Sequence, residues 1–332
     1  MLLFQEMYII WIKFEGGLNK LSLNKFTKVS YGEIFWSIIR AFLIIGLCFI
    51  ILYPLFTKFS ISFMTAQDIF DVSVRFIPRN ITFENYSIAY EWMNYPRVLF
   101  NTLSLVLTLS LFQLFSCTFV GYGFARYSFK GRELIFGLVI LTLVVPPQLL
   151  MIPLFLNFRF FRLFGIFGES GINLLGTYWP FILTSLTAMG LRNGLYIYIM
   201  RQHFRGMPDT LEEAAYVDGA GPYRTFFRIM LPGAIPVLIV VFLFSFVWQW
   251  NDTFYLRLYL RDAEGFLSYA LRTFPQTYLQ DAGVGGGGVI PQEYTAVLEN
   301  AGMVLFILPL LLLFSSLQRY FIESVQRTGI VG

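Results

Sequence analysis

Six long apolar segments alternate with polar connections along the 332-residue chain. They cover residues 36–57, 98–122, 134–157, 175–199, 233–256 and 300–321. Each is close to the roughly 20 residues that a helix needs to cross a bilayer. A backbone in lipid must satisfy its own hydrogen bonds, so each segment is predicted to be one helix. The pattern therefore predicts an all-α integral membrane protein with six transmembrane helices.

Composition supports this class, because 57% of the residues are hydrophobic and only 13% are charged. A soluble domain is nearer to about 25% charged. The net charge of +4 forms no basic stripe, so nucleic acid is not an expected partner and the lipid bilayer is. Cys48 and Cys117 both lie in apolar segments and form no disulfide or metal-site pattern.

The polar connections define an orientation and a division of the chain. Lysine and arginine favour the connections that lie inside the cell if the N-terminus is cytoplasmic. Residues 1–35 and 323–332 are then expected to be cytoplasmic segments on either side of a membrane domain of residues 36–322. Connections 58–97 and 257–299 would lie outside, and 200–232 inside.

The inner segment 207–232 has the pattern of a short helix-turn-helix. Asp209 and Glu212 have the capping-box spacing that begins a helix. Gly219 and the following Gly-Pro pair are typical of a helix end, and a second helix is expected from about Tyr223 to Pro232. From spacing alone, the segment is equally well a docking element for a soluble motor or an ordinary amphipathic connector.

A resemblance to a known family favours the docking element. The positions that match the EAA loop of binding-protein-dependent ABC permeases are Glu213, Ala214, Ala215, Gly219, Leu231 and Pro232. Asp218-Gly219-Ala220 resembles the form of the carbohydrate-uptake branch, and the chain is most similar to the second-subunit type of maltose permease. Other similar elements are Ile81–Tyr86, Gly121–Arg126 with Gly131-Arg132, Trp250–Asp252, Arg319–Phe321 and Gly329–Gly332. Residues 1–30 lie outside the resemblance.

The resemblance implies a permease subunit of an ATP-driven importer for sugars or oligosaccharides in a bacterial inner membrane. The loop residues Glu213, Ala214, Ala215, Asp218, Gly219, Leu231 and Pro232 would couple it to an ATPase. The implied partners are a second permease subunit, two ATP-binding cassette subunits and an extracellular solute-binding protein. ATP would be bound by those partners, so no cofactor, metal or catalytic residue is expected in this chain.

Two other classes fit the sequence less well. An ion-coupled secondary transporter or channel usually keeps acidic or histidine side chains inside the membrane. The apolar segments here hold almost none, and the only histidine, His203, lies in the inner connection. A membrane enzyme would need paired carboxylates, a nucleophile with a base, or a metal cluster, and none is visible. The glycine run at 285–288 lacks the Lys-Ser/Thr of a phosphate-binding loop, so it predicts a flexible outer loop.

Five residues within the apolar segments are candidates for the translocation path. Arg192 would face protein or water rather than lipid, either as a donor to substrate or as a structural anchor. Pro146-Pro147 must interrupt a helix, which either lines a cavity or merely bends the helix. Gln249 and Asn251 stand among tryptophans that suit either sugar binding or an aromatic belt at the membrane interface.

Overall fold

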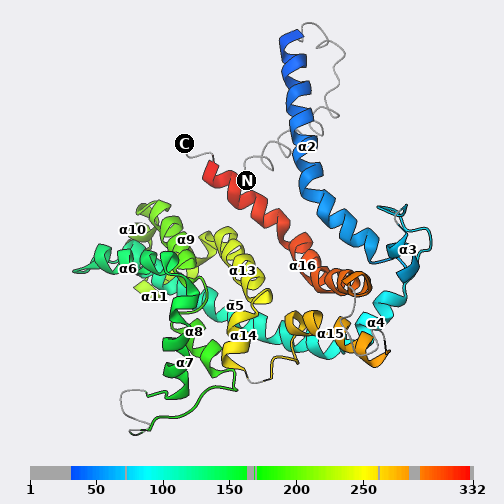
Figure 1. The fold of residues 1–332 in the computed structure, drawn as a ribbon. Helices are drawn as coiled ribbons and strands as arrows, with labels where there is room; N and C mark the ends of the chain where they lie inside the picture. Colours follow the sequence, from blue (N-terminus) through cyan, green and yellow to red (C-terminus); the bar gives the residue numbers. More distant parts are fainter. Residues whose placement is uncertain are drawn as a thin grey trace. The chain divides into compact units, whose positions relative to one another are not determined.

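The computed structural model describes residues 31–71, 73–162, 168, 170–260, 262–283 and 292–329. The chain divides into two compact units, Met1–Phe83 and Glu84–Gly332 (Figure 1). In the described residues the regular elements are all helical, and an isolated bridge joins Phe161 and Ile172. The predicted all-α membrane class is confirmed. Most of the expected segment 1–35, and residues 330–332 of the expected tail, lie outside the described residues.

The first unit contains one long helix, α2, from Tyr31 to Ile61. It includes the predicted segment 36–57, and Phe35–Ile61 is long and apolar enough to cross a membrane. Apolar side chains such as Phe42 and Ile45 are exposed along it. Such a surface belongs in contact with lipid or with another membrane protein, because water would not stabilise it.

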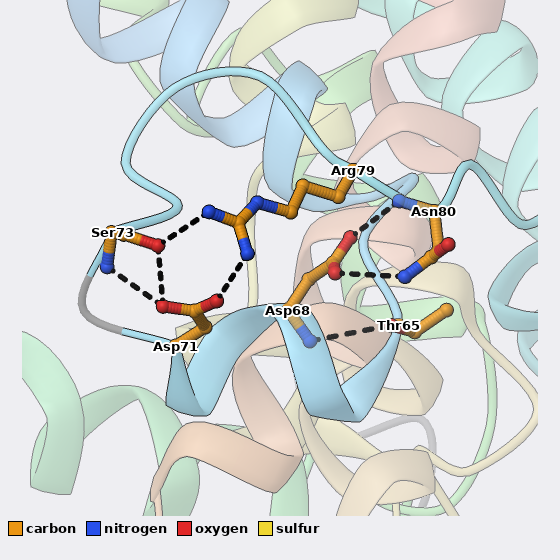
Figure 2. A network of polar contacts seen from close by, with 6 residues as sticks. All are labelled: Thr65, Asp68, Asp71, Ser73, Arg79 and Asn80. Atoms are coloured by element: carbon orange, nitrogen blue, oxygen red, sulfur yellow. Dashed lines mark hydrogen bonds and ion pairs between the residues drawn. The ribbon is translucent and has the colours of Figure 1, made fainter.

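The connection after α2 is folded around the carboxylate of Asp68. The short helix α3, Ala66–Phe70, begins after Thr65, whose hydroxyl accepts a 3.3 Å hydrogen bond from the Asp68 amide. The carboxylate of Asp68 then accepts hydrogen bonds from the backbone and side-chain nitrogens of Asn80, at 2.9 and 3.3 Å (Figure 2). These bonds join the two ends of the segment 65–80.

A second carboxylate, Asp71, closes the same segment. It accepts hydrogen bonds from the hydroxyl of Ser73 at 2.6 Å and from the guanidinium of Arg79 at 2.8 Å (Figure 2). The hydrogen bonds from the Ser73 side chain and backbone lower the pKa of Asp71, and Arg79 lowers it further. This part of the predicted outer connection 58–97 is therefore an ordered element rather than an open loop.

Helix α5, Tyr95–Arg126, forms the axis of the second unit. It packs against α9, Asn193–Gly206, and α13, Ile235–Trp250. A Cβ atom placed on Gly121 of α5 would lie 2.6 Å from the Cβ of Met200, so glycine permits this close approach of the helices. The buried core beside the crossing includes Tyr122, Tyr196, Met200, Phe204, Phe226 and Met230.

Helices α4, α8 and α15 also pack against α5 (Figure 1). Helices α10 and α11 lie towards its Arg126 end, and α4 and α15 towards its Tyr95 end. The bounds are α4 Glu84–Trp92, α6 Arg132–Val144, η1 Pro147–Leu150, α7 Met151–Arg159, α8 Trp179–Leu186, α10 Thr210–Val217, α11 Pro222–Thr225, η2 Phe226–Met230, α12 Leu231–Gly233, α14 Phe254–Tyr259, α15 Leu267–Asp281 and α16 Gln292–Gly329.

The expectation that every apolar segment is one helix is wrong for segment 134–157. Helices α6 and η1–α7 meet there at an angle of 103°. Pro146 and Pro147 stand at the break, and Val145 before them is extended, with ψ 119°. Proline lacks a backbone donor and disfavours a helical residue before it, which explains the break.

The expectation is also wrong for segments 175–199 and 233–256. The first is divided into α8 and α9 by residues 187–192, where Ala188 and Arg192 have φ of +58° and +60°. In the second, helix α13 ends at Trp250, and α14 starts separately at Phe254. In the described residues, three helices are long and apolar enough to cross a membrane, or up to five elements if each of two bent pairs is one span.

Candidate functional site

The inner segment 207–232 forms the helix-turn-helix that the sequence predicts. Helix α10 ends at Val217, and Gly219 then adopts φ +76°, a conformation that glycine reaches without strain. Pro222 occupies the first turn of the next helix, where its missing amide hydrogen is not needed. That helix continues through the π turn η2 to Gly233. Two short helices therefore meet at a tight glycine turn.

The capping box predicted for Asp209 and Glu212 is wrong. In the described structure the Asp209 side chain makes no hydrogen bond to the first turn of α10, and it forms an ion pair with Arg126 of α5 instead. Glu212 accepts a 2.7 Å hydrogen bond from the hydroxyl of Tyr122 and lies 3.5 Å from Arg126 Nε. A guanidinium is a stronger partner for carboxylates than a backbone amide, so both acids turn towards α5.

Arg126 holds this arrangement from the end of α5. Its side chain is only 8% exposed, and it also donates a 2.7 Å hydrogen bond to the backbone carbonyl of Met207. The ring of Tyr122, one turn earlier in α5, packs on Phe226 of the second short helix at a centroid distance of 4.7 Å. The helix-turn-helix is thus fixed to α5 by ion pairs on one side and by aromatic packing on the other.

Most of the loop residues that match the family pattern face outwards. Glu213, Ala214, Asp218, Gly219 and Pro232 are exposed, Leu231 is half-buried and Ala215 is buried. Two apolar side chains on the same segment are also exposed, Val217 at 87% and Tyr223 at 81%. Exposed apolar groups beside carboxylates are typical of a surface that binds another protein.

A second buried cation, Arg201, ties α9 to the start of the broken span. Its side chain is 4% exposed and its Nη2 lies 2.9 and 3.0 Å from the two carboxylate oxygens of Glu133 in α6. The guanidinium also lies 3.9 Å from the ring centroid of Phe136. Stacking and pairing together make this cation a structural anchor of α6.

A cavity of about 840 Å³ lies where the broken helices meet. Four of the five path candidates line it, namely Pro146, Pro147, Arg192 and Gln249. Asn251 does not, because its exposed side chain donates a 2.8 Å hydrogen bond back to the carbonyl of Val247. The structure thus brings together candidates that are more than a hundred residues apart in the sequence, and their role in transport stays a prediction.

The apolar segment 175–199 predicts that Arg192 lies within a helix, and this prediction is wrong. Arg192 precedes α9 in the left-handed conformation and its guanidinium lies 4.3 Å from the ring centroid of Trp248. No hydrogen bond or ion pair of this guanidinium is present among the described residues. The cation therefore faces the cavity with its donors unfilled.

Gln113 organises the polar side of the cavity, and sequence reasoning missed it. It is fully buried in α5, and its amide nitrogen donates a 2.9 Å hydrogen bond to the carbonyl of Leu191, next to Arg192. Its carbonyl oxygen accepts hydrogen bonds from Ser245 and Gln249 of α13. The visible signal was a glutamine in the middle of the apolar segment 98–122, since such a group is buried only when it is paired.

Other missed residues are Arg126, Tyr122, Asp252, Tyr255 and Tyr259. The first two hold the inner loop, and the last three line the cavity. Asp252 had a signal, because it is an acidic residue within the apolar segment 233–256. Arg126 had none beyond the resemblance, since its partners lie about 80 residues further along the chain.

The helical membrane fold agrees with the family to which the chain can be assigned. The family model of the binding-protein-dependent transport system inner membrane component matches residues 117–327, so the chain belongs to that family. Its members are transport components of the inner membrane, which agrees with the apolar helices found here.

Individual relatives agree with the family. The chain is 28% identical over 285 residues to the arabinooligosaccharides transport system permease protein AraQ of Bacillus subtilis, covering 85% of this chain and 91% of that protein. It is 31% identical over 241 residues to the osmoprotective compounds uptake permease protein GgtD of Synechocystis, covering 73% and 72%. A solved bacterial ABC transporter for import of the acidic polysaccharide alginate shares the fold, with a TM-score of 0.65, 23% identity and coverage of 89% and 99%.

Proposed function

We propose that this chain is a permease subunit of an ATP-driven importer for sugars or oligosaccharides. Membership of the family supports the transport role. The sugar class is supported by the names of relatives, which include arabinooligosaccharide, alpha-glucoside and diacetylchitobiose permeases. The chain would form the path with a second permease subunit and receive substrate from an extracellular solute-binding protein.

The observation that carries the proposal is the exposed helix-turn-helix held by Arg126. Its outward residues Glu213, Ala214, Asp218 and Gly219 offer a docking surface to the ATP-binding cassette subunits, of which the complex would hold two. ATP would bind in those subunits. The loop would then be cytoplasmic, and we propose the same side of the membrane for both termini of the chain.

The cavity is the proposed part of the translocation path in this subunit. Arg192, Pro146, Pro147 and Gln249 line it, and Asn251 lies beside it at the end of α13. The breaks in the helices free backbone groups that only a protein-lined or water-filled space can satisfy in a membrane. A path between moving helices provides such a space.

Purification and transport assays test this function directly. The tagged chain is expected to co-purify with a second permease and an ATPase, and the reconstituted complex is expected to hydrolyse ATP faster when the loaded binding protein is added. The assay includes a proton and a sodium gradient, because Asp252 is an acidic residue in the cavity lining. Uptake by this chain alone, driven by either gradient without ATP, would assign it to the ion-coupled class instead.

A further inference from the structure

The charges in the cavity lining cancel. Arg192 and Asp252 are both lining residues, and among the described residues no other Asp, Glu, Lys or Arg lines the cavity. One positive and one negative group give a formal charge of zero. A ligand with a net charge would add an unbalanced charge to this lining, whereas an uncharged ligand would not.

Asp252 presents one fixed and one open carboxylate oxygen. Its Oδ1 accepts hydrogen bonds from the backbone amides of Phe254 at 3.0 Å and Tyr255 at 3.1 Å, at the start of α14. Within the described residues no hydrogen bond reaches Oδ2. An ionised carboxylate oxygen can only accept, so a ligand in the cavity must bring donors, as the hydroxyl groups of a sugar do.

Tyr255 and Tyr259 form an aromatic wall of the same cavity. Their rings are stacked, with centroids 5.7 Å apart and planes inclined by 27°. Tyr259 is buried and is held by edge contacts with Phe158 and Phe181, each at a centroid distance of 5.2 Å. Tyr259 therefore supports Tyr255 from behind, and the half-buried Tyr255 supplies the aromatic surface of this wall.

Gln249, near the end of α13, adds a further polar group to the lining. Its amide nitrogen donates a 3.2 Å hydrogen bond to Gln113, which fixes the side chain. In the described part of the chain no donor reaches its carbonyl oxygen, so that oxygen is available as a further acceptor. The cavity thus combines a flat ring surface, a carboxylate, an amide and a guanidinium.

We infer that this cavity binds one uncharged sugar ring of the transported saccharide. The apolar face of the ring packs on Tyr255, its hydroxyl groups donate to Asp252 and Gln249, and Arg192 donates to a ring or hydroxyl oxygen. This inference rests on the proposed import of sugars and adds the binding residues and the neutral class of the substrate. The volume of about 840 Å³ lies within the range of about 300–1,000 Å³ found for small-molecule sites.

The decisive variant is Asp252→Asn. Asparagine keeps the carbonyl oxygen that caps α14 and replaces the open carboxylate oxygen by an NH₂ donor. Its matched control is Asp262→Asn, because Asp262 is exposed, caps a turn through the amide of Glu264 at 3.1 Å and does not line the cavity. Asp262→Asn is expected to assemble and to keep the wild-type ATPase response to loaded binding protein, and co-purification of the partner subunits checks that Asp252→Asn also assembles.

The readout is the radiolabelled sugar retained by the whole complex after its ATPases are trapped with ATP and vanadate. The probe is a labelled pool of neutral oligosaccharides from partial hydrolysis of plant polysaccharides. Asp252→Asn is expected to lower retention about tenfold, the effect of losing one charge-assisted hydrogen bond, and Asp262→Asn to leave it unchanged. Tyr255→Phe keeps the ring and should retain sugar, whereas Tyr255→Leu should lose it.

Each outcome separates the inference from the proposed function. If the wild type imports neither the neutral pool nor a labelled oligogalacturonate pool, the proposed function itself is contradicted. If the wild type imports the neutral pool and Asp252→Asn retains as much as Asp262→Asn, the cavity assignment alone is wrong. Import of oligogalacturonate without the neutral pool would overturn the neutral class, because it requires the carboxylate of Asp252 to tolerate a second negative charge.

Discussion

Arg126, the last residue of α5, donates a 2.7 Å hydrogen bond to the backbone carbonyl of Met207. Met207 opens the inner loop, so this bond links the central helix of the second unit directly to the surface proposed to dock the ATPase. Gln113 lies 13 residues earlier in α5, about 20 Å along the helix at 1.5 Å per residue. It accepts a hydrogen bond from Gln249, which lines the cavity. Helix α5 therefore contacts both the proposed docking loop and the lining of the cavity.

Replacing Arg126 by alanine is expected to uncouple ATP hydrolysis from transport. The change leaves Glu212 half-buried beside α5 without its cation and frees the first turn of α10. Sugar transported per ATP hydrolysed should fall about tenfold or more in reconstituted complexes, while assembly persists. Arg126→Lys should restore part of the ratio, because lysine keeps the charge but not the several directed donors. An unchanged ratio in Arg126→Ala would show that the contacts of Arg126 with the loop do not couple ATP hydrolysis to transport.

The apolar pattern identified the membrane class and the inner loop because both depend on local sequence. Long apolar runs give membrane helices whatever their partners are, and the Gly219 turn follows from the dihedral preference of glycine. The breaks within the apolar segments were harder to predict from the sequence. The proline pair at 146–147 was visible, but the break around Ala188 and Arg192 depends on Gln113, which binds the turn from another helix.

The capping box failed for the same reason. The spacing of Asp209 and Glu212 suits a cap, and only the distant Arg126 redirects both side chains. Likewise, Asp252 and Pro146 line the same cavity only because the fold brings the third and fifth apolar segments to it. Contacts of this kind are tertiary, so a pattern of single residues does not contain them.

Gly121→Ala is expected to destabilise the second unit, because the added Cβ would lie 2.6 Å from the Cβ of Met200 and 3.0 Å from the amide nitrogen of Arg201. Overpacking of this kind costs about 1–3 kcal/mol. Gly123→Ala is the matched control, since no atom lies within 4 Å of a Cβ there. Thermal unfolding in detergent should show a lower midpoint for Gly121→Ala only. Equal midpoints would mean that α5 and α9 adjust without cost.

The segment 65–80 is expected to loosen in acid. The pKa of Asp71 is lower in the folded chain than its ordinary value of 3.8, so its bonds contribute stability that is fully present above that value. This contribution is lost as the pH falls through the lowered pKa. Proteolysis by an acid-active protease across this range should show faster cleavage of the segment at low pH. Asp71→Asn should remove the pH dependence, and a dependence that persists would assign it to another group.

Gly219→Asp and Glu213→Lys are expected to abolish sugar uptake while the protein remains in the membrane. Gly219 has φ +76°, and a residue with a side chain is strained there by about 1–3 kcal/mol, which moves α10 relative to the second short helix. Glu213 is exposed, so its charge reversal changes the proposed docking surface without disturbing the core. Membrane content by immunoblot and co-purification of the ATPase separate the two effects. Both variants should lose the ATPase during purification, whereas Asp262→Asn should keep it, and full uptake in Glu213→Lys would move the docking surface elsewhere on the chain.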